Sequence, residues 1–332
     1  MTLEAPMFPF PAFQLVSLAM AVLSVRTLGR AWRHRQRLLA EPLESRQLGL
    51  LVELALFVLV PVSVLLHELG HAVAVWLAGG RVTGFGYLLF LGWVEYVGVE
   101  SRAAQFWITL SGNVVSVVLG ATALGVGLFG PFRRPVNALL LVAGGMVLTT
   151  TLLFYPLLDV ATGLQGDWTQ LYRAGGRAPL LLGAVHASLL LGGIALWRSR
   201  WLRWRVSERI GLPWRLDERD RRALAWRQLA EAAEQLRGTE PALDIAFEQR
   251  DGVPQLALRW VGPDGPRVLL TRLGERPDIV EAVALAGDPP TVRANWRALV
   301  SENALFRQPS PFVTLLERLR AATDALRLAE GA

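Results

Sequence analysis

The sequence predicts a polytopic α-helical membrane protein, with about five transmembrane helices and a membrane-associated β-hairpin, followed by a soluble C-terminal α+β domain. Hydrophobic residues make up 52% of the 332 residues, and the mean hydropathy is +0.36. Apolar residues are concentrated in positions 1–200, whereas charged residues dominate positions 201–332. We divide the chain into an N-terminal anchor with a basic loop (1–48), a membrane core (49–200) and a soluble domain (206–332).

The first apolar run, residues 8–25, is long enough to cross a bilayer. We expect a retained anchor, because a cleaved signal peptide needs a basic start and this chain has Glu4 there. The second span, residues 49–79, contains Pro61, at which we expect a kink.

The next segment, residues 82–99, is apolar but is predicted to form extended strands. Four glycines and Glu95 interrupt it, and glycine alternating with aromatic residues favours a hairpin over a helix. A hairpin exposed to lipid would leave strand edges unpaired, so we expect it to lie against the protein or at the interface. Three further helices are expected at residues 103–130, 136–158 and 178–197.

The soluble half is predicted to begin with an amphipathic helix, residues 217–237. Alternating apolar and polar residues then predict four strands, and two helices are expected after them. We expect strands at 242–249, 254–261, 266–272 and 278–285, and helices at 290–300 and 311–328. The domain has no His, no Cys and no glycine-rich phosphate loop, so we expect a regulatory or substrate-docking module.

Charge and cysteine content restrict the classes of site and partner. The chain has no Cys, which excludes disulfides and thiolate metal ligands. All 34 basic residues are Arg, and those of the membrane half flank its apolar runs. This distribution indicates contact with a lipid bilayer and not with nucleic acid.

Two histidines in the second span predict a metal site. In His67-Glu68-Leu69-Gly70-His71 the two His are four residues apart, about 40° around a helix and about 6 Å along it, so both can bind one metal ion. Ionisable groups in an apolar segment are costly unless they pair or bind something. In the HExxH arrangement of zinc peptidases, the Glu takes a proton from the activated water and delivers it to the leaving amine.

A catalytic zinc site uses three protein ligands and one open position, so a third ligand is needed. Asp159 is the only acidic residue between Glu100 and Asp167, and it stands at the end of an apolar helix. The alternative for Asp159 is a carboxylate at a helix end on the membrane surface. His186 is the rival ligand, with the alternative that it is a hydrogen-bonded packing residue.

These residues resemble the site-2 protease (M50) family of intramembrane zinc metalloproteases, over roughly residues 49–175. Four features match the family pattern in order. HELGH corresponds to the HExxH of that family, and the expected hairpin corresponds to its membrane-associated hairpin. Its small-residue motif is matched by Ser111-Gly112-Asn113, and its acidic motif by Pro156-Leu157-Leu158-Asp159. The sequence is similar to a divergent member, because it departs from the family pattern at Asn113, Ser116, Thr151, Phe154 and Val160.

The resemblance implies roles for particular residues. His67, His71 and Asp159 are expected to bind Zn²⁺, Glu68 to act as general base, and Asn113 to help hold the substrate backbone. The implied activity is zinc endopeptidase cleavage in or near a transmembrane segment of a membrane protein substrate. Two other classes stay open: a catalytically silent scaffold or chaperone of the same fold, and an ion-binding transporter.

The expected localisation is the cell membrane, as a multi-pass protein. Placing both arginine clusters, residues 26–37 and 198–205, in the cytoplasm gives a cytoplasmic C-terminal domain. The helix with HELGH would then run from inside to outside. Members of the family that the chain resembles usually run it the other way, so the side to which the site opens is left undecided.

Overall fold

The computed structural model describes residues 10–163, 165–250, 252–262, 265–300 and 311–326. The chain divides into two compact units, Met1–Ile210 (unit 1) and Gly211–Ala332 (unit 2). Glu4, residues 8 and 9 of the expected first span, and residues 327 and 328 of the expected last helix lie outside the described residues.

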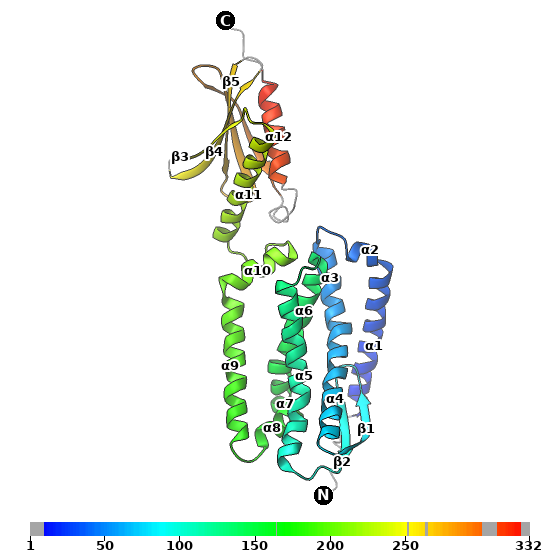
Figure 1. Cartoon of the computed structure of the whole chain (residues 1–332). Helices are drawn as coiled ribbons and strands as arrows, with labels where there is room; N and C mark the ends of the chain where they lie inside the picture. Colours follow the sequence, from blue (N-terminus) through cyan, green and yellow to red (C-terminus); the bar gives the residue numbers. More distant parts are fainter. Residues whose placement is uncertain (1–9, 164, 251, 263–264, 301–310, 327–332) are drawn as a thin grey trace. The chain divides into compact units, whose positions relative to one another are not determined.

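Unit 1 consists of helices and one small hairpin (Figure 1). Its early helices are α1 (Phe10–Arg33), α2 (Arg35–Leu38), α3 (Ser45–Leu54), the π-helical segment η1 (Ala55–Leu59) and α4 (Val60–Leu77). After the hairpin come α5 (Arg102–Phe129), α6 (Arg134–Thr149), the π-helical segment η2 (Thr150–Phe154), α7 (Tyr155–Thr162), α8 (Asp167–Arg173), α9 (Ala178–Arg198) and α10 (Arg200–Ile210).

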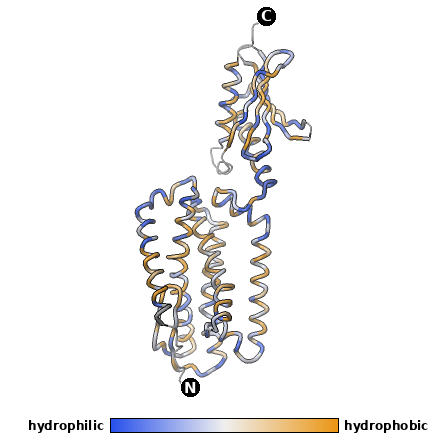
Figure 2. Tube along the Cα trace, turned by 180° about the vertical axis from the view of Figure 1, so that it is seen from behind, coloured by the Kyte–Doolittle hydropathy of each residue, from blue (hydrophilic) through white to orange (hydrophobic). Residues whose placement is uncertain are grey.

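The long helices of unit 1 are predominantly hydrophobic along their length (Figure 2). Among the described residues, five are long and apolar enough to cross a membrane: Gln14–Arg33, Arg46–Leu77, Arg102–Phe129, Arg134–Thr162 and Ala178–Arg198. Their number agrees with the sequence prediction, and their length and composition are compatible with membrane association.

A π-helical turn precedes Pro61, the residue at which a kink is expected. Segment η1 ends two residues before Pro61, and the Val60 N–H bonds the Ala55 carbonyl, five residues back. Proline has no N–H, so the carbonyl of Phe57, four residues before it, loses its usual α-helical partner. The Ser24 hydroxyl of α1 donates to this carbonyl at 2.6 Å, which joins α1 to the helix that carries HELGH.

Close helix crossings in unit 1 depend on glycine. A Cβ on Gly70 of α4 would lie 3.4 Å from the Gly112 Cα and 2.8 Å from Val115 Cγ2 of α5. A Cβ on Gly144 of α6 would lie 2.7 Å from the Gly120 carbonyl oxygen of α5. Small residues let helix backbones approach closely, so α5 packs tightly against both α4 and α6.

The expected hairpin is present as β1 (Arg81–Tyr87) and β2 (Gly92–Val97), an antiparallel two-stranded sheet. It contacts α4. The Tyr87 hydroxyl donates to the Pro61 carbonyl at 2.7 Å, and the Ser17 hydroxyl donates to the Leu88 carbonyl at 2.6 Å. Its turn is therefore fixed to α1 and α4, in agreement with the expectation that it lies against the protein.

Unit 2 is an α+β domain with a five-stranded antiparallel sheet in the order β3-β4-β5-β6-β7. Helices α11 and α12 contact one another and lie against the sheet (Figure 1). The bounds are α11 (Glu218–Thr239), β3 (Asp244–Arg250), β4 (Val253–Gly262), β5 (Gly265–Leu273), β6 (Ile279–Ala286), β7 (Thr291–Leu299) and α12 (Pro311–Asp324).

The helix predicted at residues 290–300 is wrong, because this segment is strand β7. It pairs with β6 along its length, with Trp296 opposite Ala282. Ala294, Trp296 and Ala298 are half-buried and alternate with exposed polar residues. That period of two is typical of an edge strand with one covered face.

The core of unit 2 forms between the sheet and the helices. Leu258 of β4 lies opposite Leu269 of β5, and both are fully buried together with Phe312 and Leu316 of α12. The Trp260 indole N–H donates to the Asp324 carboxylate at 2.8 Å, which fixes the end of α12 to β4.

We expect residues 211–332 to fold as an isolated domain, because this core lies within unit 2. Leu316→Ala should lower the free energy of unfolding by about 2–5 kcal/mol, since it leaves a cavity under the sheet. The measurement is urea denaturation followed by circular dichroism. Val261→Ala is the matched control, because Val261 is 84% exposed, and should change the free energy by less than about 0.5 kcal/mol. An isolated domain without a cooperative transition would contradict this division of the chain.

Candidate metal centre

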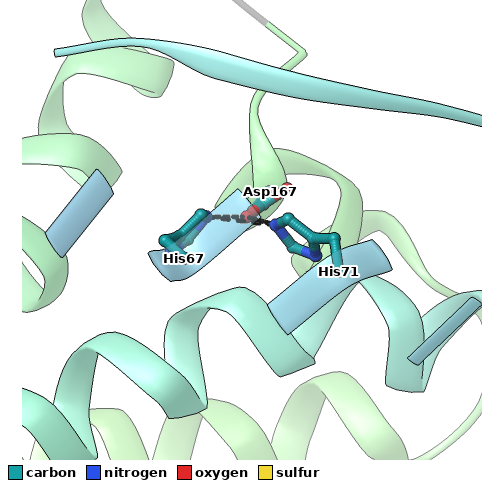
Figure 3. Close-up of side chains that lie close together, drawn as sticks. All are labelled: His67, His71 and Asp167. Carbon is teal, nitrogen blue, oxygen red and sulfur yellow. Dashed lines mark hydrogen bonds and ion pairs between the residues drawn. The ribbon is translucent and has the colours of Figure 1, made fainter. Parts of the chain in front are cut away.

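Three side chains from two distant parts of the sequence converge inside unit 1 (Figure 3). His67 and His71 extend from α4, and Asp167 is the first residue of α8. The Asp167 Oδ2 lies 3.0 Å from His67 Nε2 and 2.9 Å from His71 Nε2, and the two Nε2 atoms are 3.1 Å apart. These separations are a few tenths of an ångström shorter than the roughly 3.3 Å between ligands at a tetrahedral site with bonds of about 2.0–2.1 Å.

Both imidazole rings are oriented by hydrogen bonds at Nδ1. His71 Nδ1 lies 2.7 Å from the Ile108 carbonyl oxygen, which can only accept, so this nitrogen carries the hydrogen. His67 Nδ1 lies 3.1 Å from the Ser116 hydroxyl. Histidine ligands usually donate their second N–H to a carbonyl or another acceptor, which fixes the ring and leaves Nε2 free to bind a metal.

This arrangement requires a positive charge between the rings and the carboxylate. With its hydrogen on Nδ1, neutral His71 presents the Nε2 lone pair to the Asp167 oxygen, and two lone pairs repel unless a proton or a cation lies between them. Burial raises the pKa of Asp167, but the neighbouring His71 and His67 lower it more, so the carboxyl has a pKa below its usual range. The group formed by His67, His71 and Asp167 can hold a metal ion.

The space beside the two His nitrogens exists because residue 112 is glycine. A Cβ on Gly112 of α5 would lie 2.4 Å from His71 Nε2 and 2.7 Å from His67 Nε2. Any larger residue would displace both rings. The glycine therefore lets α5 pass closely while the nitrogens stay directed at Asp167, and the donor set fits a divalent ion.

The acidic member of the group is Asp167, whereas the sequence prediction named Asp159, and this is a correction. Asp159 lies in the last turn of α7 and is buried, and its Oδ2 accepts from the Thr169 backbone N–H at 3.4 Å. A Cβ on Gly166 would lie 2.3 Å from its Oδ1. Asp159 thus contacts the start of α8. The first residue of that helix, Asp167, faces the histidines.

Pro156 leaves two carbonyl oxygens free, and one of them binds α8. Segment η2 ends two residues before it, and the Tyr155 N–H bonds the Thr150 carbonyl, five residues back. Because Pro156 has no N–H, the Thr151 and Leu152 carbonyls lack their intrahelical partner. The Trp168 indole N–H donates to the Thr151 carbonyl at 2.9 Å.

His186 donates a hydrogen bond to the second free carbonyl. It is therefore a hydrogen-bonded packing residue, which is the alternative to a ligand role that the sequence leaves open. Its Nε2 donates to the Leu152 carbonyl at 2.7 Å, and its Nδ1 lies 2.5 Å from the Tyr172 hydroxyl. The ring stacks on Trp168 with centroids 4.4 Å apart. Both nitrogens are thereby used, and His186 is absent from the metal-ligating group.

Glu68 is buried on α4, between the two histidines in sequence. A Cβ on Gly92, the first residue of β2, would lie 2.7 Å from Glu68 Oε1. The Tyr155 hydroxyl donates to the Phe90 carbonyl at 3.1 Å, which ties the hairpin turn to α7. The hairpin therefore passes directly over the carboxylate of Glu68.

Asn113, expected to help hold the substrate backbone, lies beside Asp167. Its side chain is 3% exposed, and its Nδ2 donates to the Asp167 Oδ2 at 3.4 Å. The substrate role stays a prediction. Sequence reasoning missed Asp167 and the role of Ser116. A usable signal was Gly166-Asp167-Trp168, an acidic residue starting a helix directly after a short glycine-containing loop.

Comparisons of the chain with protein-family models, with curated proteins and with solved structures found no match.

The correction of the third ligand is directly testable. Purified protein should contain about one divalent metal ion per chain, and His67→Ala, His71→Ala and Asp167→Asn should lose it, because two protein ligands hold such an ion poorly. Asp159→Asn should retain the ion, because an amide oxygen can still accept from Thr169. The measurement is elemental analysis by mass spectrometry. Loss of metal in Asp159→Asn with retention in Asp167→Asn would contradict the structure.

The hydrogen bond behind His67 should contribute to metal affinity. Ser116→Ala removes the hydroxyl at Nδ1, and loss of such an outer partner typically weakens binding by about 10- to 100-fold. Competition with a fluorescent chelator measures this change. Ser188→Ala, which removes an exposed hydroxyl that bonds only within α9, is the control. Equal affinities for the two variants would show that Ser116 does not orient the ring.

Proposed function

We propose that the chain is an intramembrane zinc metalloendopeptidase that hydrolyses peptide bonds in or near transmembrane segments of membrane proteins. The observation that carries the proposal is the convergence of His67 Nε2, His71 Nε2 and Asp167 Oδ2 in a unit with long apolar helices. Glu68, next to His67 in the chain, is buried on the same helix. The resemblance to the site-2 protease family supports it at HELGH and at the hairpin.

Zinc is the ion that suits these donors. Two imidazoles and one carboxylate match the ligand set of catalytic zinc sites, which keep a fourth position open. Hard cations such as Mg²⁺ prefer oxygen ligands, and this chain has no thiolates for softer ions. When bound, zinc would supply a Lewis acid that lets water lose a proton near neutral pH.

Glu68 is assigned the proton transfers of hydrolysis. It takes a proton as the water oxygen bonds the substrate carbonyl carbon, and it returns that proton to the amide nitrogen as the C–N bond breaks. Its carboxylate is buried and is covered by the main chain at Gly92.

We assign binding of the substrate backbone to the hairpin. A peptide bond within a transmembrane helix is protected by its own hydrogen bonds, so the segment must be unwound before it can react. The two-stranded sheet leaves each strand with one unpaired edge, and such an edge can pair with extended backbone. Its turn lies next to Glu68, so a segment added there would reach the site.

The membrane part of the proposal is supported by five apolar helices and by the position of tryptophan. Trp76 and Trp107 are exposed at the end of the bundle where the hairpin lies. At the opposite end, where α1 and α9 end and α10 begins, the exposed indoles are those of Trp32, Trp197 and Trp201. Tryptophan is enriched at both membrane–water interfaces, so two such groups fit a helix bundle that spans a bilayer.

The proposal predicts that Glu68→Gln abolishes cleavage while zinc content and fold are retained, because the amide cannot accept the proton. The assay uses proteoliposomes that contain a panel of single-span model proteins, with products identified by mass spectrometry. Glu53→Gln is the matched control, since Glu53 lies in the same long helix segment but pairs with Arg30.

Unchanged cleavage by Glu68→Gln would remove this residue from the mechanism. A wild-type protein that binds zinc and cleaves no member of the panel would favour the catalytically silent scaffold. Zinc that moves across the vesicle membrane without cleavage would favour the ion-binding transporter.

A further inference from the structure

The two ends of the helix bundle in unit 1 carry different charge. The arginine end consists of the segments 26–46, 129–134 and 198–210, which join α1 to α3, α5 to α6 and α9 to α10. The hairpin end consists of the segments 78–102 and 162–178, which include the hairpin and α8. Figure 1 shows α2 and α10 at the first end, and α8, β1 and β2 at the second.

Hydrogen bonds hold the segments of the arginine end together. Arg205 Nε of α10 donates to the Leu128 carbonyl of α5 at 2.9 Å. The Arg134 backbone N–H of α6 donates to Glu41 Oε1 of the α2–α3 connection at 2.8 Å. The three segments thus form one surface of unit 1.

The arginine end holds thirteen Arg and three Glu, whereas the hairpin end holds four Arg and three acidic residues. Figure 2 shows the corresponding hydrophilic colouring near α2 and α10. Trp32 and Trp201 lie in the same segments as these arginines, and their indoles are exposed. Arginine next to tryptophan suits the headgroups of an anionic leaflet, and short loops rich in Arg are retained in the cytoplasm.

The metal centre lies nearer the hairpin end. His71 is six residues before the end of α4 at Leu77, or about 9 Å along the helix axis, and 25 residues after Arg46, or about 38 Å. Asp167 belongs to the hairpin end itself. Of the two ends, the hairpin end is therefore the nearer one for water that reaches the site.

We infer that unit 1 lies in the membrane with the arginine end at the anionic cytoplasmic leaflet, so that the metal centre opens toward the opposite side. The inference rests on the proposed membrane-spanning unit, but it needs neither zinc nor cleavage. It decides the orientation that the sequence left open in favour of the charge distribution. The substrates are then segments whose scissile bond lies in the half of the membrane away from the cytoplasm.

The natural absence of cysteine makes the test free of background labelling. Single-cysteine variants place one thiol at each position: Gly175→Cys in the α8–α9 connection, Ala40→Cys in the α2–α3 connection and Gly238→Cys in unit 2. Gly175 and Gly238 have open space around an added Cβ, and Ala40 is exposed. Intact bacterial cells that express the full chain are treated with a membrane-impermeant maleimide, before and after permeabilisation.

Gly175→Cys should be labelled in intact cells, whereas Ala40→Cys and Gly238→Cys should be labelled only after permeabilisation. The reverse pattern would overturn the orientation. Labelling of all three variants in intact cells, or of none, would also overturn it, because the two ends would not then lie on opposite sides. Since the readout is independent of metal and of peptide cleavage, a failed Glu68→Gln experiment leaves this result interpretable.

Discussion

The metal centre depends on one missing hydrogen-bond donor, the absent N–H of Pro156. In an apolar helix a free carbonyl is costly, because neither water nor a neighbouring amide satisfies it. The freed Thr151 and Leu152 carbonyls are bonded by Trp168 of α8 and His186 of α9. The interrupted helix therefore binds the next two helices at these carbonyls, and the first residue of α8 is Asp167, the acidic member of the group that could hold a metal ion.

The pattern at His67 and His71 could be predicted from sequence because both ligands lie on one helix, where spacing fixes geometry. The hairpin and four strands of unit 2 were predictable for the same local reason. The sequence predicts Asp159 because it is the only acidic residue between Glu100 and Asp167 and ends the motif Pro156-Leu157-Leu158-Asp159. Which acid reaches the histidines depends instead on how α8 packs after α7. That packing is fixed by contacts to Gly166 and Thr169, which no local pattern encodes. The strand at 291–299 was missed because its face is defined by pairing with β6.

The site also depends on glycine, which lets the backbone of α5 and of the hairpin lie close to the side chains of HELGH. Gly112 admits the imidazole nitrogens beneath α5, and Gly92 admits the Glu68 carboxylate beneath the hairpin. Neither position needs an unusual backbone conformation. At each position a side chain of HELGH occupies the space where a Cβ would lie, so main chain borders the group directly.

The ligands are separated by about one hundred residues, and this spacing orders the events of biosynthesis. His67 and His71 are synthesised with the second long apolar helix, but Asp167 follows only after two further long helices. Until α8 has been made and seated on the Pro156 turn, the nascent chain offers only two imidazoles and binds a metal weakly. Tight binding of a metal ion by this group would therefore begin only after α8 is in place.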